Sequence, residues 1–302
     1  MYQCFQHFLM SNDCLIEELT YYKNLTEITA DCIINNSGAI ISRAQKIKSC
    51  GTFIETAHIQ DPDGNEREVV TSANFCRERL CPMCQRRKSL KTSSDVRKLV
   101  EYLNGRGWIH MVLTVKNCSA SELDETITKL FHDSSFLITK TPEFKNAFRG
   151  ALRCLEVTFN SETDTYHPHL HVLLSSDKSY NNNSRKRISR DRLRWLWWEV
   201  SGIDYMPQVH IDSNVNEGII AEIAKYCVKP LELDLPSSKR CEVLETLHSA
   251  LHGRRLMQTY GEIKTAFKAL KIDINSDSDR EYVADTEQMF VYDFELSQYW
   301  KR

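Results

Sequence analysis

The stretch His167-Pro-His-Leu-His-Val-Leu-Leu174 places a histidine at every second position and then continues as an aliphatic run. Successive side chains of a β-strand point to opposite faces of a sheet, so His167, His169 and His171 would share one face. Two imidazoles two residues apart on a strand can chelate one divalent cation. A single histidine is more often a satisfied core or surface residue, but three at strand spacing predict a metal site.

A carboxylate stands in the middle of a second apolar strand candidate, Leu155-Glu-Val-Thr-Phe159. A polar turn over residues 161–165 connects this segment to the histidine strand, so pairing of the two strands would bring Glu156 beside the histidines. A buried carboxylate without a partner is unfavourable, which favours a ligand role. Imidazoles alone suit Zn, Cu or Ni, and an ion that acts on phosphate also needs an oxygen ligand. Glu156 is the candidate for that ligand.

The chain has eleven cysteines, an odd number, and its first ten residues lack the basic start of a signal peptide. A disulfide scaffold is therefore a poor interpretation. Three thiols lie within nine residues, in Cys76-x4-Cys81-Pro82-Met83-Cys84, and Cys50 lies just before a predicted hairpin that returns the chain to them. These four predict a structural Zn²⁺ site, because zinc prefers four soft ligands in a tetrahedron. A redox CxxC pair or simple burial is the alternative.

Length and composition limit the possible classes. The 302 residues, 41% hydrophobic and 26% charged, fit one large or two ordinary globular domains. No apolar run approaches the roughly 20 residues of a membrane span, so we expect a cytoplasmic protein without a membrane partner. The net charge is −2, but residues 1–45 carry −3 and residues 272–302 carry −5, which leaves +6 for residues 46–271. This basic middle is compatible with nucleic-acid binding.

Two clusters of basic residues are candidate DNA contacts. The first follows the cysteines on a predicted helix over residues 86–103, and it comprises Arg86, Arg87, Lys88 and Lys91. Such a helix suits phosphate contacts, although a solvated helix face has the same composition. The second cluster comprises Arg185, Lys186 and Arg187. Three tryptophans follow it at positions 195, 197 and 198, of which we expect at least one in the core and another could stack on a single-stranded base.

The segment Glu222-x3-Tyr226-x2-Lys229 has i, i+4, i+7 spacing, which places the three side chains on one face of a helix. A tyrosinate can attack phosphorus and form a covalent phosphotyrosine. The unperturbed pKa of tyrosine, about 10, means that it needs activation by a metal or a cation. Lys229 could stabilise charge on the phosphate. An ordinary amphipathic helix has the same pattern, so this segment alone is weak evidence.

Strand and helix signals interleave along the chain, which predicts the α+β class. We expect strands over residues 108–115, 152–160 and 169–174, and helices over residues 86–103, 121–131, 190–200, 217–228 and 241–251. The expected division is a variable N-terminal extension (1–45), a zinc-binding cysteine subdomain (46–92), a catalytic domain (93–232), and a helical C-terminal region with an acidic tail (233–302).

Taken in their order along the chain, the segments described above resemble those of the plasmid rolling-circle replication initiators of the HUH endonuclease superfamily. The resemblance covers about residues 50–270. The matching pieces are Cys50-Gly51, the cysteine segment with Arg87-Lys88-Ser89-Leu90, Val112–Asn117, Leu155–Thr158, His167–Leu173 and the Glu222 to Lys229 pattern. The ordered combination is specific, although no single piece is decisive.

The resemblance implies a fold and a reaction. The fold would be an antiparallel central sheet flanked by helices, with the cysteine cluster inserted. Glu156, His169 and His171 would hold a catalytic Mg²⁺ or Mn²⁺, and His167 would be a further ligand or orient the DNA. Tyr226, assisted by Lys229, would nick the plasmid double-strand origin, keep the 5′ end covalently and free a 3′-OH.

The resemblance also suggests how replication would terminate and which partners the protein would bind. In similar single-tyrosine initiators, a glutamate at the position of Glu222 activates water for the terminating cleavage. The alternative is that Glu222 forms a salt bridge with Lys225 or Lys229. Expected partners are single-stranded and hairpin origin DNA, and the host helicase and polymerase.

Three other functions share parts of this pattern. A transposase of related single-strand chemistry also combines zinc-binding cysteines with an HUH strand. A non-catalytic, zinc-dependent DNA-binding regulator would use the histidine strand structurally. A metal-dependent hydrolase acting by bound water would form no protein–DNA adduct.

Overall fold

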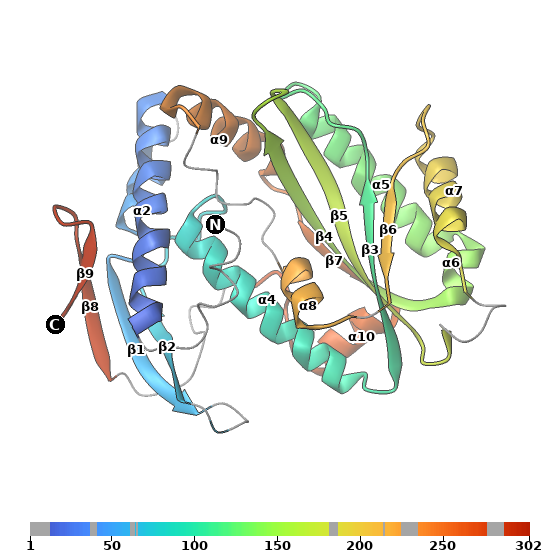
Figure 1. The fold of residues 1–302 in the computed structure, drawn as a ribbon, viewed down its shortest axis with the longest axis horizontal. Coiled ribbons are helices and arrows are strands. Elements are labelled where there is room, and N and C mark those ends of the chain that lie inside the picture. The colour runs from blue at the N-terminus through green and yellow to red at the C-terminus, as the bar shows by residue number, and fades with distance from the viewer. Residues whose placement is uncertain are drawn as a thin grey trace. The chain divides into compact units, whose positions relative to one another are not determined.

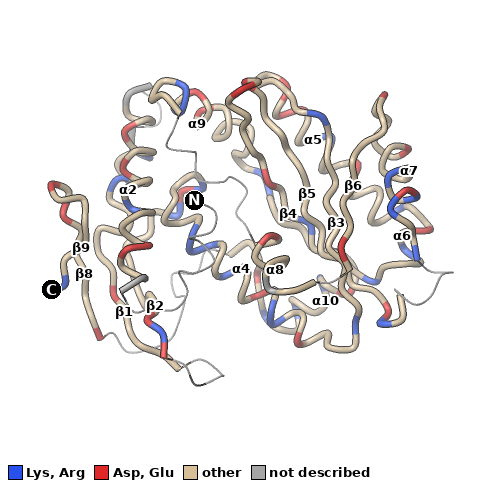
Figure 2. The backbone as a smooth tube through the Cα atoms, viewed as in Figure 1, with Lys and Arg blue, Asp and Glu red and all other residues tan. Residues whose placement is uncertain are grey.

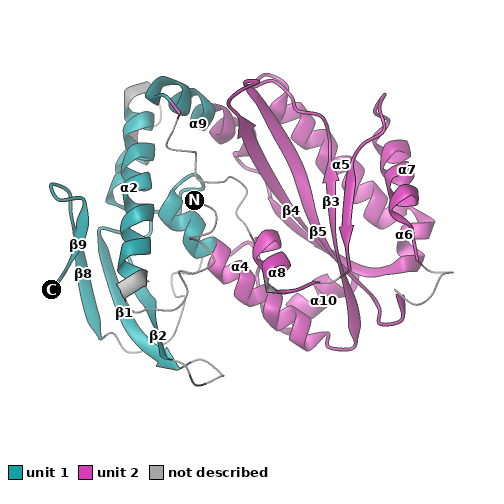
Figure 3. Cartoon of the chain, viewed as in Figure 1, with its two compact units in different colours: residues 1–88, 236–245, 277–302 teal, residues 89–235, 246–276 magenta. Residues whose placement is uncertain are grey.

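The structure is a computed structural model that describes residues 13–36, 41–60, 64, 66–180, 187–213, 215–224, 235–276 and 287–302. The chain forms two compact units (Figure 3). Unit 1 comprises residues 1–88, 236–245 and 277–302, and unit 2 comprises residues 89–235 and 246–276. Each unit contains one antiparallel sheet with helices, so the predicted α+β class is confirmed.

Unit 2 contains a five-stranded sheet in the order β6-β3-β5-β4-β7, in which every neighbouring pair is antiparallel. The strands are β3 (Arg106–Thr114), β4 (Phe148–Asn160), β5 (Thr165–Asp177), β6 (Val209–Asp212) and β7 (Met257–Tyr260). The two long strands β4 and β5 form a hairpin. Its turn is stabilised by Asn160, whose Oδ1 accepts hydrogen bonds from the backbone N–H groups of Glu162 and Thr163.

Helices cover both faces of this sheet (Figure 1). On one face lie α5 (Leu123–Lys140), α6 (Pro142–Ala147) and α7 (Arg190–Ser201). There the buried guanidinium of Arg153, on β4, donates to the carbonyl of Phe131 in α5. The opposite face is covered by α8 (Glu217–Ala224), α10 (Gly261–Ala269) and the C-terminal part of α4 (Pro82–Tyr102). Apolar residues of these three helices pack with Leu152 and Leu173 of the sheet in one hydrophobic core.

Unit 1 contains a four-stranded antiparallel sheet in the order β2-β1-β8-β9. Its strands are β1 (Phe53–Gln60), β2 (Glu66–Ala73), β8 (Gln288–Asp293) and β9 (Gln298–Lys301). The helices α2 (Asp13–Asn36) and α3 (Ile41–Ser49), the first residues of α4 and the first part of α9 (Ser237–Leu251) belong to the same unit. Its core combines residues from both ends of the chain, such as Leu19 in α2 and Phe290 in β8.

The strands expected over residues 108–115, 152–160 and 169–174 are confirmed as β3, β4 and β5, and the hairpin expected around residues 61–64 is formed by β1 and β2. The C-terminal region differs from its helical expectation. It contains α9 and α10, but also β7, β8 and β9. These short strands are stabilised by partners that are distant in the sequence, since β7 pairs with β4 and β8 pairs with β1. The four-part functional division itself stays a prediction.

Candidate metal centres

The pairing of β4 with β5 brings the predicted carboxylate and histidines together. Glu156 lies opposite His169 in the register, and Cys154 lies opposite His171, so these side chains share one face of the sheet. Oε2 of Glu156 lies 2.9 Å from Nε2 of His169 and 2.8 Å from Nε2 of His171. Candidate ligand atoms of all three residues lie within 4.8 Å of one another.

Both imidazoles present the same nitrogen to Glu156 because their other nitrogen is engaged elsewhere. Nδ1 of His169 lies 3.2 Å from the carbonyl oxygen of His167. A carbonyl only accepts, so Nδ1 of His169 carries the hydrogen. Nδ1 of His171 lies 3.1 Å from Nε2 of His110, a buried residue of β3. The two Nε2 atoms therefore converge on one carboxylate oxygen, which also can only accept.

The electrostatics of this group fit a cation. Burial tends to raise the pKa of Glu156, but the hydrogen bonds with His169 and His171 outweigh it and hold this pKa well below its usual range. Glu156 therefore stays ionised although it is only 3% exposed. Ligands about 2.1 Å from one ion and at right angles to each other lie roughly 3 Å apart, close to the distances of 2.8 and 2.9 Å here. The group can hold a divalent metal ion.

His167 lies beside this group and is not part of it. Its ring packs against that of His169, with centroids 5.1 Å apart. Burial is the main cause that lowers the pKa of His167, followed by the neighbouring His169. Whether His167 binds the ion or orients the DNA stays a prediction.

The helix that leads toward Tyr226 lies over the same sheet face. Ile220 and Ile223 of α8 pack with Cys154 and Leu173, which belong to the strands that carry the metal ligands. Glu222 is half-buried near the end of this helix. Tyr226 and Lys229 lie outside the described residues.

The four predicted zinc ligands also converge, in unit 1. Sγ of Cys84 lies 3.6 Å from Sγ of Cys50 and 3.7 Å from Sγ of Cys76. Cys81 completes the group, and all four sulfur atoms lie within 4.8 Å of one another. Four sulfurs about 2.3 Å from a central ion in a tetrahedron lie about 3.8 Å apart, so the spacing fits a tetrahedral metal centre.

Backbone donors support the thiolate form of these cysteines. The N–H of Cys76 lies 3.3 Å from Sγ of Cys50, and the N–H of Arg77 lies 3.2 Å from Sγ of Cys84. Arg77 has a φ of +61°, the left-handed conformation that a tight ligand turn requires. Hydrogen bonds from the other three cysteines hold the pKa of Cys84 far below its usual range. The pKa of Cys50 is raised, mainly by its hydrogen bond with Cys76, and that of Cys81 is raised, mainly by burial. All four thiols therefore lose their protons only when a cation balances the charge.

The basic residues that follow the cysteines are engaged within the protein. Arg86 forms two hydrogen bonds of 2.8 Å with the carboxylate of Glu18. Arg87 and Lys88 are buried, and the Arg87 guanidinium lies over the ring of Phe75. Nζ of Lys91 lies 2.6 Å from Asp95. These contacts favour structural roles. This part of α4 is therefore neither a solvated helix face nor a row of basic side chains that are free to bind phosphate.

The second basic cluster is described only in part. Arg187 is exposed, whereas Arg185 and Lys186 lie outside the described residues. Of the tryptophans, Trp197 is fully buried and its Nε1 donates to the carbonyl of Thr114, as expected for a core residue. Trp195 is 51% exposed and packs edge-on against Trp198. Figure 2 shows basic and acidic residues interspersed along α7, which carries these side chains.

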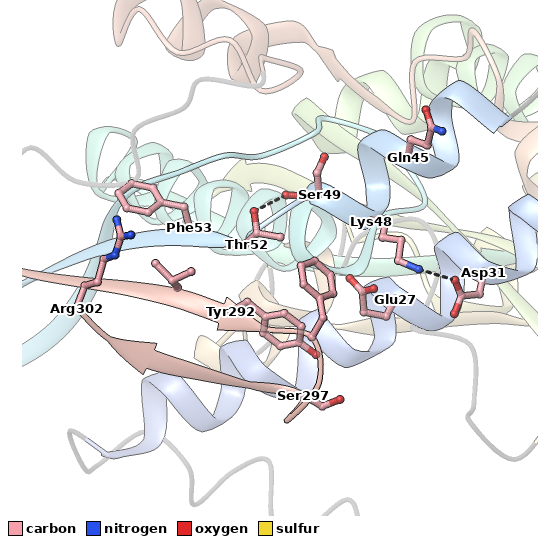
Figure 4. Close-up of a pocket in the computed structure, with 12 residues that line it drawn as sticks. Glu27, Asp31, Gln45, Lys48, Ser49, Thr52, Phe53, Tyr292, Ser297 and Arg302 are labelled. Atoms are coloured by element: carbon pink, nitrogen blue, oxygen red, sulfur yellow. Dashed lines mark hydrogen bonds and ion pairs between the residues drawn. The ribbon is translucent and has the colours of Figure 1, made fainter.

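The structure also contains features that the sequence did not indicate. His110 was missed because one histidine in a strand has no distinctive pattern, although its place in β3 puts it on the face of His171. Unit 1 has a pocket of about 1000 Å³ between its helices and sheet, lined by residues such as Phe53, Tyr292 and Arg302 (Figure 4). Neither metal-binding group lines this pocket. Within the described residues, no helix is both long and apolar enough to cross a membrane.

Comparisons with known proteins identify the family of the chain. A family model described as "Replication protein" matches residues 67–301. "Protein rep" of Streptococcus pneumoniae serotype 2 (strain D39 / NCTC 7466) is 32% identical over 252 residues, which cover 80% of this chain and 76% of the relative. "Protein rep" of Bacillus amyloliquefaciens is 30% identical over 284 residues, which cover 85% of this chain and 82% of the relative. No solved structure matches the chain.

A chain with two groups that could each hold a metal ion, on an α+β scaffold, thus has relatives that are replication proteins. The chain belongs to the replication protein family, and its resemblance to plasmid replication initiators is confirmed.

Replacing Cys84 by Ser should remove the metal of the cysteine group, because Cys84 contacts two of the other ligands and a backbone donor. We expect the metal content, measured by plasma mass spectrometry, to fall by one equivalent and the melting temperature to fall by more than about 5 °C. Cys118→Ser is the control, since this buried thiol donates to the carbonyl oxygen of Tyr166 and does not belong to the cysteine group. A Cys84→Ser protein with full metal content would contradict the assignment.

Proposed function

We propose that this protein initiates rolling-circle replication of a plasmid by nicking one strand of the double-strand origin. The observation that carries the proposal is the convergence of Glu156, His169 and His171 on one face of the sheet. Helix α8 packs against the same face, and Tyr226 follows this helix in the sequence. Membership of the replication protein family gives independent support.

The three ligands suit a Mg²⁺ or Mn²⁺ ion, which would supply a Lewis acid for the scissile phosphate. Glu156 brings a negative charge at neutral pH because its pKa is held low. The side chain of His169 is 12% exposed and that of His171 is 7% exposed. His169 is therefore the more accessible of the two histidine ligands.

Tyr226 is the proposed nucleophile. Its phenol loses a proton, the oxygen attacks phosphorus, and the bond between phosphorus and the 3′ oxygen breaks. The 5′ phosphate is then esterified to Tyr226, and the released 3′ oxygen takes up a proton to become the primer for the host polymerase. Lys229, three residues after Tyr226 in the sequence, stabilises the negative charge on the phosphate.

Glu222 is the proposed base for termination. It precedes Tyr226 by four residues in the sequence, the i, i+4 spacing, so its carboxylate would take a proton from a water molecule that attacks the second scissile phosphate. Hydrolysis leaves no second phosphotyrosine, and replication stops instead of starting again.

The cysteine group is proposed as a structural Zn²⁺ site, since four closely spaced thiolates are typical of zinc. Proposed DNA contacts are the exposed Arg187 together with its neighbours Arg185 and Lys186. Arg86, Arg87, Lys88 and Lys91 remain candidates only where DNA binding releases their present partners. The proposed partners are single-stranded and hairpin origin DNA, and a host helicase and polymerase.

Replacing Tyr226 by Phe should abolish covalent attachment to DNA, because the ring stays and only the attacking oxygen is lost. The measurement is incubation of the full chain with a single-stranded origin oligonucleotide and Mn²⁺, followed by denaturing electrophoresis and peptide mapping of the adduct. Tyr205→Phe is the matched control, since its hydroxyl only accepts a hydrogen bond from the N–H of Lys116. An adduct that persists in Tyr226→Phe would show that another residue is the nucleophile.

Replacing Glu222 by Ala should separate initiation from termination. We expect the first nick and its adduct to form within about twofold of the wild-type rate, whereas the hydrolytic second cleavage slows by about 100-fold or more, the usual effect of removing a general base. The measurement is a two-site substrate whose products report each cleavage. Glu199→Gln, an exposed change on α7, serves as the control. Normal termination in Glu222→Ala would assign Glu222 to a salt bridge instead.

A further inference from the structure

His110 lies next to the candidate metal centre, and the edge of its ring contacts the edge of the His171 ring. Nε2 of His110 lies 3.1 Å from Nδ1 of His171, and the two ring planes are parallel within 3°. The ring centroids are 5.3 Å apart, which exceeds the nitrogen–nitrogen distance by about one ring diameter. The rings therefore lie edge to edge in nearly one plane, the geometry of a direct N–H···N hydrogen bond.

This geometry excludes His110 from the group of direct ligands. His171 uses opposite edges of its ring, with Nε2 toward Glu156 and Nδ1 toward His110. Among the residues that the structure describes, the converging ligand atoms at this site belong to Glu156, His169 and His171. His110 therefore acts on the metal centre through His171.

The protonation of His171 explains why this contact matters. A neutral imidazole has one N–H and one lone pair, so Nε2 can bind a cation only when the hydrogen sits on Nδ1. That hydrogen needs an acceptor, and Nε2 of His110 is placed to accept it. His169 has the carbonyl of His167 for the same purpose. The orientation of His171 thus depends on a side chain, which a substitution can remove.

We propose that His110 is a positioning residue that accepts the Nδ1–H of His171 and holds its Nε2 toward the divalent ion. The inference rests on the proposed function, because the divalent ion belongs to the proposed nicking site. An imidazole can donate as well as accept. Before the ion binds, His110 can therefore also donate its Nε2–H to Nδ1 of His171.

Three variants of the full chain test this role. His110→Phe keeps a ring and removes the acceptor, and His110→Gln restores an acceptor near the position of Nε2. His210→Gln is the control, because His210 is an exposed residue of the neighbouring strand β6. We expect the Kd for Mn²⁺, measured by calorimetry, to rise about 10- to 100-fold in His110→Phe, the usual effect of losing such a partner. The other two variants should stay near the wild-type value.

A spectroscopic signature separates positioning from general loss of structure. Pulsed electron paramagnetic resonance of bound Mn²⁺ detects the nitrogens of coordinated imidazoles. We expect two imidazoles in the wild type and His110→Gln, and one in His110→Phe. If His110→Phe does not fold, His110→Met replaces it, since methionine is close in size to glutamine and offers no comparable acceptor.

The outcomes distinguish the inference from the proposed function. Wild-type affinity and two imidazoles in the variant without an acceptor would overturn the role of His110 and leave the metal site intact. A wild-type protein whose Mn²⁺ has no coordinated imidazole would overturn both.

Discussion

The register between β4 and β5 is the constraint on which the candidate site depends. Glu156 lies opposite His169, and this pairing puts one carboxylate and two imidazoles on the same face of the central strands. A slip by one residue would move Glu156 to the face covered by α5, away from both histidines. Leu155 and Leu170 adjoin the ligands in the sequence and pair with each other in the register, and both are buried on that opposite face, which favours this register. The alternation of apolar and ligand side chains along β4 and β5 thus specifies both the hydrophobic core and the candidate metal centre.

The sequence predicted these parts because their signals are local. The three histidines at strand spacing, the carboxylate within an apolar strand and the short turn between them are sufficient to predict the convergence of Glu156, His169 and His171. The three cysteines within nine residues likewise predicted a metal centre, and the hairpin formed by β1 and β2 explains why Cys50 is the fourth member.

Other features depend on contacts between distant segments and could not be predicted. Arg86 looks like a DNA contact in the sequence, but its partner Glu18 lies 68 residues earlier. Strand β8 pairs with β1 across more than 200 residues, and nothing in its short sequence indicates which strand is its partner. His110 contacts His171 only because β3 and β5 are neighbours in the sheet. In each case tertiary packing decided the role of a residue whose local pattern was ambiguous.

We propose above all that Glu156, His169 and His171 hold a divalent ion. The most direct test is a crystal structure of the full chain with Mn²⁺ and single-stranded origin DNA, using anomalous scattering at the manganese edge. We expect an anomalous peak within coordination distance of Oε2 of Glu156 and Nε2 of both histidines, with a DNA phosphate beside it. Well-ordered DNA with no manganese at these three residues would contradict it.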